Sequence, residues 1–326
     1  MTRMILDADP GIDDVIAIML ALHTKEIQIE AITTVNGNCS LQNATQNTFR
    51  VLDLCKRKDI KVYEGTDRPI VRKNNDATEV HGDDGLGGID YQEVAITPEK
   101  ENAISYMTKM VRQNPGQITM VATGPLSNLA LAVQKDPQFA NNVKELIVMG
   151  GAEKGGNITP YAEFNFWNDP EAAKVVFEAG FQNIVMLGLD VTRKIVLTPN
   201  LREFLRQIDS PYAKFIHDIT RQYNNFHWEK FRILGSVIND PLNIMYLIKP
   251  TMFHLVDAYV TLTTEGEKVG QTVIDRKGKE HEGKCNAKIG IDIDSKGFFE
   301  ILLNTLFPNE KEDIKLVLNH EFANKN

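Results

Sequence analysis

The sequence is poor in cysteine and has no excess of basic residues, and both features exclude classes of protein. Its three cysteines, Cys39, Cys55 and Cys285, are odd in number and widely spaced along 326 residues. They predict neither a disulfide framework nor a zinc site, and a reducing, cytoplasmic setting is expected. Acidic residues outnumber basic ones by 44 to 36, giving a formal net charge of -8. A nucleic-acid surface normally carries a basic excess, so no nucleic-acid partner is expected.

Long apolar runs are also missing. The most apolar early run, residues 15–22, is far shorter than the roughly 20 residues that span a bilayer. No charged stretch followed by an apolar one opens the sequence, so we expect neither a signal peptide nor a membrane partner. No repeat, low-complexity tract or Gly/Ser-rich linker divides the chain. Residues 1–326 are therefore expected to form a single domain.

What the sequence does contain is an alternation of short apolar runs with stretches of helical spacing. This alternation predicts βαβ units, and hence an α/β fold with a mainly parallel sheet flanked by helices. Extra helices are expected in the C-terminal half, over 201–228 and 241–247, with a late hairpin or edge strands at 256–263 and 271–274. The expected strands are 4–6, 27–35, 60–63, 118–122, 146–149 and 184–187, and the expected helices between them are 15–22, 41–55, 103–111, 126–133 and 170–179.

Polar residues cluster just after the predicted strands. In an open parallel sheet, ligands bind beyond the carboxyl ends of the strands. The sequence therefore predicts a polar binding site at this edge of the sheet. The residues that follow strands in this way are Asp7, Asp9, Asn36, Asn38, Thr123, Gly150, Gly151 and Asp190.

The densest polar group is acidic. Asp7, Asp9, Asp13 and Asp14 lie within eight residues at the first strand-to-helix turn. Four like charges repel unless a cation or hydrogen-bond donors compensate them, and an oxygen-ligated cation such as Ca²⁺ would do so. A simpler interpretation is that Asp13 or Asp14 caps the following helix, but a cap needs only one such residue.

A second kind of chemistry also begins with aspartates after a first strand. Phosphohydrolases of the haloacid-dehalogenase type use one of them as a nucleophile. They are expected to carry a Thr or Val soon after the second Asp, where this chain has Pro10 and Gly11. An Asp-nucleophile phosphohydrolase therefore stays as the alternative enzyme class.

Several segments resemble the motifs of the inosine–uridine-preferring nucleoside hydrolases. Residues 7–14 (DADPGIDD) look like the signature of that family, and residues 156–173 (GNITPYAEFNFWNDPEAA) are the longest and most specific match. The resemblance is clear over about residues 3–245. Shorter matches occur in the same order as in the family, at 35–38, 81–88, 122–130, 149–151 and 240–241.

The resemblance implies a Rossmann-like open sheet and an activity, the calcium-dependent hydrolysis of the N-glycosidic bond of ribonucleosides. It implies that Asp9, Asp14 and Asp240 supply carboxylate ligands to Ca²⁺ and Thr123 its backbone carbonyl. Members commonly form homodimers or homotetramers, and one of these assemblies is expected here. The residues that match those holding the ribose are Asp13, Asn38, Asn157, Glu163 and Asn165.

The residue types suit that chemistry. A ribose has three free hydroxyls, and Asn, Asp and Glu supply the fixed donors and acceptors that grip them. Asp9 is the candidate base that takes a proton from the attacking water. Carboxylates around the ribose would stabilise the positive charge of an oxocarbenium-like transition state.

The sequence departs from the family pattern at Asn239. Most members that accept both purines and pyrimidines carry a histidine there, thought to protonate the leaving base, and an amide does not titrate near neutral pH. His81 lies inside a matching loop and is, with Asn239, a candidate catalytic residue that could help to activate the leaving base. His227 and Trp228, in a helical region that flanks the base in the family, are candidates for binding it. A lone histidine is often structural, and Trp228 could be core packing or a stacking platform. Asn239 also leaves open a nucleoside-binding protein that does not cut, and release of ribose would separate that alternative from an enzyme.

Overall fold

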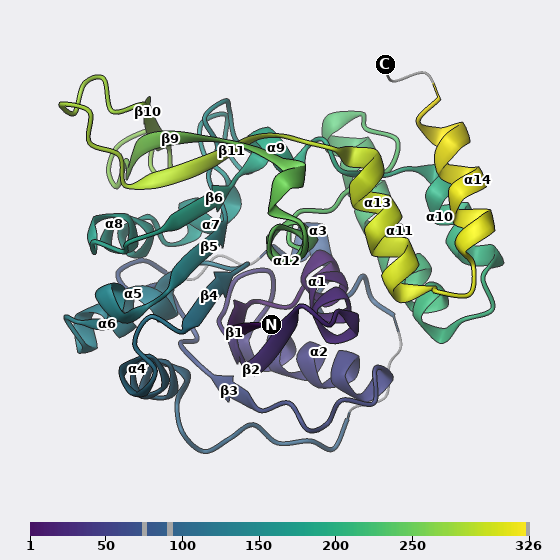
Figure 1. Ribbon diagram of the computed structural model, residues 1–326, viewed down its shortest axis with the longest axis horizontal. Helices are drawn as coiled ribbons and strands as arrows, with labels where there is room; N and C mark the ends of the chain where they lie inside the picture. The colour runs from purple at the N-terminus through teal and green to yellow at the C-terminus, as the bar shows by residue number, and fades with distance from the viewer. Residues whose placement is uncertain (74–76, 90–93, 324–326) are drawn as a thin grey trace.

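The computed structural model describes residues 1–73, 77–89 and 94–323, and a nine-stranded sheet lies at its centre (Figure 1). The strand order is β10-β9-β11-β6-β5-β4-β1-β2-β3. All neighbouring pairs from β11 to β3 are parallel, whereas β9 is antiparallel to both β11 and β10. The strands are β1 (Thr2–Ala8), β2 (Ile27–Thr34), β3 (Val62–Glu64), β4 (Ile118–Ala122), β5 (Glu145–Met149), β6 (Ile184–Leu187), β9 (Phe253–Leu262), β10 (Thr272–Arg276) and β11 (Ala287–Ile293).

Helices cover both faces of the sheet. Alternation along β1 sends Met4 and Leu6 into one core cluster and Ile5 into the other, as the period of two in a strand requires. β4 and β6 are buried at every residue, which is the pattern of parallel strands covered on both faces. The first face carries α1 (Ile12–His23), α2 (Leu41–Leu54), α10 (Pro199–Gln207), α11 (Pro211–Phe231), α12 (Pro241–Ile248), α13 (Ser295–Leu306) and α14 (Lys311–Glu321), and the second carries α4 (Ala103–Gln113), α5 (Ser127–Lys135), α6 (Phe139–Asn142) and α8 (Pro170–Glu178).

This architecture confirms the predicted α/β fold, with corrections in the C-terminal third. The helix expected over 201–228 is two helices, because Ser210 caps a new helix that begins at Pro211. β9 and β10 form the expected late hairpin at the edge of the sheet. β11, which lies between β6 and β9, and the helices α13 and α14 were not predicted.

The order of the strands reverses beside β1. The chain moves outward from β1 to β2 and β3, and then returns to the other side of β1 with β4. The loops after β1 and β4 therefore diverge at a topological switch point, where open α/β sheets bind ligands. Short elements complete the described fold: α3 (Thr78–His81), α7 (Phe164–Asn168), α9 (Leu189–Thr192), β7 (Val196–Leu197), β8 (Ser236–Val237) and a 3₁₀ turn, η1 (Pro250–Met252).

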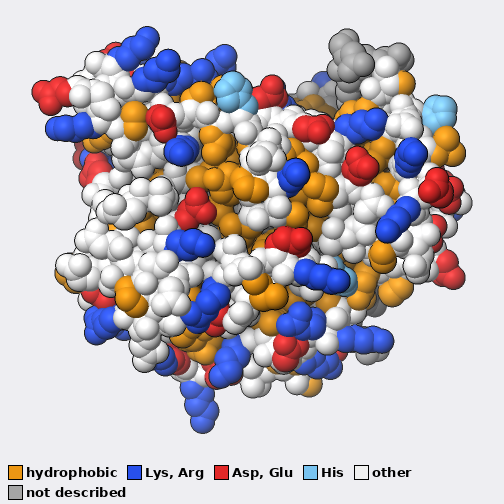
Figure 2. Space-filling model, in the orientation of Figure 1, with side chains coloured by type: hydrophobic (Ala, Val, Ile, Leu, Met, Phe, Trp, Pro, Cys, Tyr) orange, Lys and Arg blue, Asp and Glu red, His pale blue; other side chains and the backbone are white. Residues whose placement is uncertain are grey.

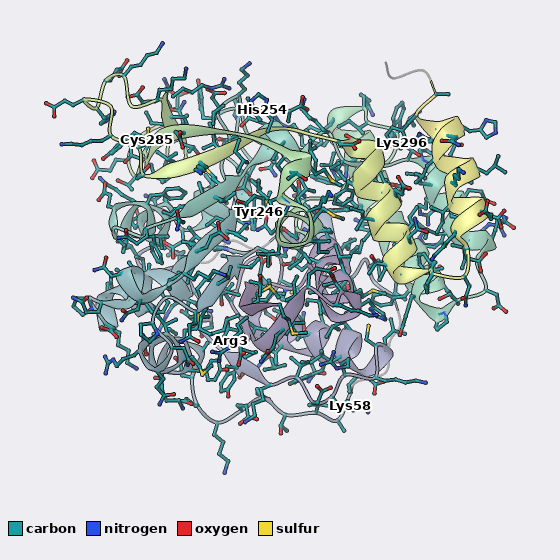
Figure 3. All side chains as sticks on the ribbon, viewed as in Figure 1. Arg3, Lys58, Tyr246, His254, Cys285 and Lys296 are labelled. Carbon is teal, nitrogen blue, oxygen red and sulfur yellow. The ribbon has the colours of Figure 1, made fainter. Side chains whose placement is uncertain are left out.

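Surface charge, the state of the cysteines and the character of the helices can be compared with the expectations from composition. On the face drawn in Figure 2, basic and acidic side chains are interspersed around apolar ones near the middle, so the charges there form no continuous basic surface. The three cysteines are free thiols, and Cys285 is exposed in the segment that leads into β11 (Figure 3). In the described part of the chain, no helix combines the length and the apolar character needed to cross a bilayer.

Candidate active site

A cavity of about 550 Å³ opens at the carboxyl ends of the parallel strands. Most of the residues predicted for the site line it, although they come from loops and helices far apart in the sequence. Asp9 and Asp14 are fully buried beside the lining residues Asn38 and Thr123. The predicted residues in the lining are Asp13, Asn38, His81, Thr123, Asn157, Glu163, Asn165, His227, Asn239 and Asp240.

An acidic cluster lies on one wall of the cavity. Carboxylate oxygens of Asp13, Asp14 and Asp240 all lie within 4.8 Å of one another, and all three residues are buried. Asp13 and Asp14 occupy the first turn of α1, and Asp240 is the N-cap of α12. Two helix N-termini therefore place their partial positive charge at the cluster, which favours carboxylates there.

Asp14 and Asp9 are held by donors from neighbouring loops. The Thr123 hydroxyl donates to Asp14 Oδ1 at 2.7 Å, and Gly11 N and Asn38 Nδ2 each donate to Asp14 Oδ2 at 3.0 Å. The Asn38 backbone N–H donates to Asp9 Oδ2 at 2.7 Å. In contrast, Asp9 Oδ1 is buried and has no hydrogen-bond partner within the described residues.

Two loops that contact Asp9 require glycine at the point of contact. A Cβ atom added at Gly37 would lie 2.0 Å from Asp9 Oδ2, and one added at Gly124 would lie 2.7 Å from Asp9 Oδ1. Both distances are well inside van der Waals contact, so a side chain at either position would displace the carboxylate. The backbone thus fixes Asp9 from two sides.

Burial and mutual repulsion disfavour the charged forms of these acids. Burial, followed by the charge of Asp14, raises the pKa of Asp9 well above its usual range. Burial and the charge of Asp13 raise the pKa of Asp14 to about 6. Burial and three neighbouring carboxylates raise the pKa of Asp240 well above its usual range. A cluster of this kind lacks positive charge, and its oxygen atoms could hold a metal ion.

Asp7 does not belong to this cluster, contrary to the interpretation of four acids sharing one cation. Its Oδ1 accepts hydrogen bonds from the Thr33 hydroxyl at 2.6 Å and from Asn128 Nδ2 at 2.8 Å. Asn128 lies on α5, the opposite face of the sheet from α1. Side chains two residues apart in a strand share a face, so Asp7 points the same way as Ile5.

Asp13 is held by donors from α11 and from the segment before α12. The Tyr223 hydroxyl donates to Asp13 Oδ1 at 3.0 Å. Asn239 donates to Asp13 Oδ2 twice, from its backbone N–H at 3.0 Å and from Nδ2 at 2.8 Å. The amide of Asn239 therefore fixes the orientation of a carboxylate at the cavity wall.

The long motif at 156–173 contributes another wall of the cavity. Glu163 is the N-cap of α7 and accepts from Gly151 N and Asn165 N, both at 2.8 Å. Burial raises the pKa of Glu163 to about 7. Asn165 Nδ2 donates at 2.7 Å to the backbone carbonyl of Thr123, the carbonyl expected to bind a metal. A carbonyl oxygen has two lone pairs, so this bond leaves one for a cation.

Comparison with known proteins identifies the family and the fold. The family model described as inosine–uridine preferring nucleoside hydrolase matches residues 4–300. The chain belongs to this family. The pyrimidine-specific ribonucleoside hydrolase RihA of Salmonella gallinarum is 37% identical over 305 residues, covering 93% of this chain and 97% of that protein.

Solved structures of nucleoside hydrolases agree with this assignment. A plant nucleoside hydrolase superposes with a TM-score of 0.89 at 32% identity, covering 94% of this chain and 98% of the other. A purine-preferring ribonucleoside hydrolase from Gardnerella vaginalis gives a TM-score of 0.89 at 26% identity, covering 95% and 100% of the two chains. As a nucleoside hydrolase, the protein is an enzyme that acts on N-glycosyl compounds, and the phosphohydrolase alternative is set aside.

The structure places Trp228 of this nucleoside hydrolase outside the cavity. Its side chain is 47% exposed and stacks under the guanidinium of Arg232, with 5.4 Å between the guanidinium carbon and the ring centroid. On α11 the cavity-lining side chains are Tyr223, Phe226, His227, Lys230 and Phe231. Steps of three and four residues share one face of a helix, whereas Trp228 lies on another face. The prediction of a base contact for Trp228 therefore has no geometric support.

Two aromatic residues of the cavity wall, Tyr223 and Phe226, were not among the site residues predicted from the sequence. The hydroxyl of Tyr223 contacts Asp13 across more than 200 residues of sequence. Phe226 lies one turn farther along the same face of α11 and lines the cavity. Phe226 follows Tyr223 by three residues, and Lys230 follows Phe226 by four. This spacing places the three side chains on one face of a helix, so it is the sequence signal that could have identified the cavity-lining face of α11.

Proposed function

We propose that the protein hydrolyses the N-glycosidic bond of ribonucleosides in a calcium-dependent reaction, releasing ribose and free base. One observation carries this proposal: three buried carboxylates within 4.8 Å of one another on the wall of a cavity large enough for a nucleoside. Such a cluster is costly to bury without a cation. Polar side chains of the ribose-holding type surround it.

The donor set fits Ca²⁺. Calcium takes six to eight oxygen ligands from carboxylates, carbonyls and water. Asp9, Asp14 and Asp240 would supply carboxylates and Thr123 its carbonyl, and the unpartnered Asp9 Oδ1 is a buried oxygen that a cation would satisfy. Asp13 lies close enough to be a further ligand. When bound, the ion supplies Lewis-acid chemistry that lowers the pKa of a water molecule.

The chain's own residues would perform the remaining steps. Asp9 would accept a proton from the attacking water, since a carboxylate beside the bound ion can act as its general base. The water oxygen bonds to the anomeric carbon as the bond to the base nitrogen breaks, and the base leaves with that electron pair. Asp13, kept in place by Tyr223 and Asn239, stabilises the positive charge that develops on the ribose.

The polar wall predicts a strong preference for ribosides. We propose that Asp13, Asn38, Asn157, Glu163 and Asn165 bind the ribose hydroxyls. A site built to hydrogen-bond a hydroxyl rejects the analogue that lacks it by about 10⁴-fold. We therefore expect kcat/KM for 2′-deoxyuridine to be lower than that for uridine by about this factor. Equal rates for the two, measured by release of uracil, would contradict the assignment of this wall.

The higher identity to a pyrimidine-specific relative favours pyrimidine nucleosides as the substrates of this protein. The chain shares 37% identity with a pyrimidine-specific ribonucleoside hydrolase and 26% with a purine-preferring one. We propose that uridine is cleaved better than inosine. Incubation of the purified protein with calcium and uridine, cytidine, inosine, adenosine or guanosine, followed by chromatography of ribose and base, tests both the reaction and this preference. Binding of ribosides with no release of ribose would instead support the non-catalytic binding protein.

Asn239 is proposed to position the carboxylate of Asp13, and substitution of Asn239 tests this role. Asn239→Ala removes the Nδ2 bond to Asp13 and leaves only the backbone N–H. A hydrogen bond to a charged group contributes about 1.5–3 kcal/mol, so we expect kcat/KM for uridine to fall roughly 10–100-fold. Tyr223→Phe removes the other side-chain donor to Asp13 and should have an effect of the same order. If Asn239→Ala retained full kcat/KM, Asn239 would not be a positioning residue.

The assembly and the setting of the protein stay predictions. We propose a homodimer or homotetramer in a cytoplasmic setting, on the resemblance to the family. Light scattering on the purified protein would measure its mass against the 36.7 kDa of one chain. A mass of one chain at micromolar concentration would contradict the predicted assembly.

A further inference from the structure

A loop that contains neither helix nor strand, residues 150–161, leads from β5 towards α7. It carries Asn157, which lines the cavity and is proposed to bind the ribose. Outside helices and strands, backbone groups depend on side chains, turns or water for their hydrogen bonds. Contacts with neighbouring elements therefore fix the conformation of such a loop, and the residues that make them determine where Asn157 lies.

The short helix α9 holds the first half of this loop with two side chains of opposite charge. α9 follows β6, the parallel neighbour of β5 in the sheet (Figure 1). Asp190 accepts from two consecutive backbone N–H groups, from Glu153 N to Oδ2 at 2.6 Å and from Lys154 N to Oδ1 at 3.1 Å. Arg193 donates to two backbone carbonyls, from Nη1 to Lys154 O at 3.2 Å and from Nη2 to Gly156 O at 2.6 Å. Hydrogen bonds of this kind, with one charged partner, are stronger than those between neutral groups.

The positions of Asp190 and Arg193 suit a grip on the loop. They are three residues apart, and residues at this spacing share one face of a helix. The sequence placed Asp190 at the polar edge of the sheet, where a binding site is expected. In the structure Asp190 is not part of the cavity lining, whereas Arg193 is. Asp190 is therefore a polar residue of this edge that contacts the loop instead of the cavity.

The grip of Arg193 reaches the peptide group that precedes Asn157. The carbonyl of Gly156 and the N–H of Asn157 belong to one planar peptide unit. Arg193 binds the carbonyl, and the N–H donates to Ala162 O at 3.1 Å, so this unit is held from both sides. Asn157 Oδ1 accepts from Phe164 N at 2.9 Å. The amide nitrogen, Nδ2, is then the group of Asn157 that can donate to a ligand.

We propose, on the basis of the proposed function, that Asp190 and Arg193 are positioning residues that hold the loop after β5 so that Asn157 presents its amide to the ribose. Without them, the loop samples conformations in which Asn157 lies away from the ribose. A substrate then binds tightly only to the fraction of molecules whose loop is in place, and its apparent affinity falls by that fraction. Once bound, it meets an unchanged acidic cluster, whose donors come from other segments. KM should therefore rise while kcat changes little.

The test measures kcat and KM for uridine separately, by uracil release in saturating calcium. Arg193→Ala removes both bonds to the loop carbonyls, and Asp190→Ala removes both bonds to the loop N–H groups. Loss of hydrogen bonds to a charged group at a solvent-exposed position should raise KM about 10-fold in each variant, with kcat within about twofold of the wild type. Arg193→Lys keeps the charge but not the planar fork that reaches two carbonyls, so it should restore part of the wild-type KM.

Lys194→Ala is the matched control, because it removes a cation from the next residue, whose Nζ lies 2.8 Å from Asp292 Oδ1 and not at the loop. It should keep the wild-type KM. Combined with Asn157→Ala, Arg193→Ala should raise KM little further, since the side chain through which it acts is already gone.

Three results would overturn the inference while leaving the hydrolase assignment intact. They are an unchanged KM in folded Arg193→Ala and Asp190→Ala proteins, a fall in kcat without a rise in KM, and fully additive effects of Arg193→Ala and Asn157→Ala. A wild type that cleaves no ribonucleoside at all would overturn the proposed function itself, and this inference with it.

Discussion

Asp9→Asn is expected to abolish nearly all uridine hydrolysis. The substitution keeps the size of the side chain but removes the proposed proton acceptor and a proposed carboxylate ligand of the metal. Loss of a general base alone lowers the rate by about 10²–10⁴-fold, and weaker metal binding should add to this. We expect kcat to fall at least about 10³-fold in saturating calcium, as measured by uracil release. The fold should persist, since Asp9 Oδ2 has one donor, the Asn38 backbone N–H.

Asp7→Asn is the matched control for this variant. Asp7 is also a fully buried aspartate of the same segment, but its partners Thr33 and Asn128 lie on the other side of the sheet from the cluster. An amide oxygen can accept the same two hydrogen bonds, so Asp7→Asn should retain kcat within a few-fold. Similar activities for the two variants would show that proximity in sequence, and not position at the cluster, determines the effect.

Asp240→Asn is expected to stabilise the metal-free protein while it removes activity. Asp240 is buried against Asp13, Asp14 and Asp9, whose charges disfavour its ionised form. An asparagine has no charge to desolvate. We expect the melting temperature of the metal-free variant at pH 7.5 to exceed that of the wild type by about 2–4 °C, a shift that corresponds to roughly 1 kcal/mol in a large domain. Stability lost to a functional charge is a common trade-off at active sites.

The pH dependence of this difference has a defined sign. The pKa of Asp240 is higher in the folded state than in the unfolded state, so its ionisation destabilises the fold above the folded-state pKa. The destabilisation decreases as the pH falls through that value and disappears near pH 4, where both states are protonated. The advantage of Asp240→Asn should therefore shrink between pH 7.5 and pH 5. In the presence of calcium, the wild type should have the higher melting temperature of the two proteins. An ion that binds only the folded state stabilises the protein that binds it more tightly.

The parallel part of the fold could be predicted because its signals are local. β4 and β6 are short, mostly apolar segments buried on both faces, and amphipathic helices lie between them along the chain. β11 was missed because its pairing is not local: it enters the sheet between β6 and β9, about 100 residues after β6. Its Lys288 and Asp292 also interrupt the apolar run that marked the other strands.

In the site too, residues placed by local signals could be predicted, whereas contacts between distant segments could not. The loops after β1, β2 and β4 could be predicted because residues at strand ends must meet at one edge of a parallel sheet. The bonds from Tyr223 and Asn239 to Asp13 join segments more than 200 residues apart, and no sequence spacing encodes them. For Trp228 the sequence indicated the correct helix, but the rotation of that helix is set by packing and turns the ring away from the cavity.

Uridine cleavage before and after metal is restored tests the proposed metal centre. The purified protein is treated with a chelator, the chelator is removed, and ribose release is measured as calcium is added in steps. We expect little release without metal and recovery that saturates with calcium, with no recovery in the Asp9→Asn or Asp240→Asn variants. Full ribose release by the metal-free wild type, unchanged by calcium, would contradict the claim that the buried acidic cluster is the metal centre of this hydrolase.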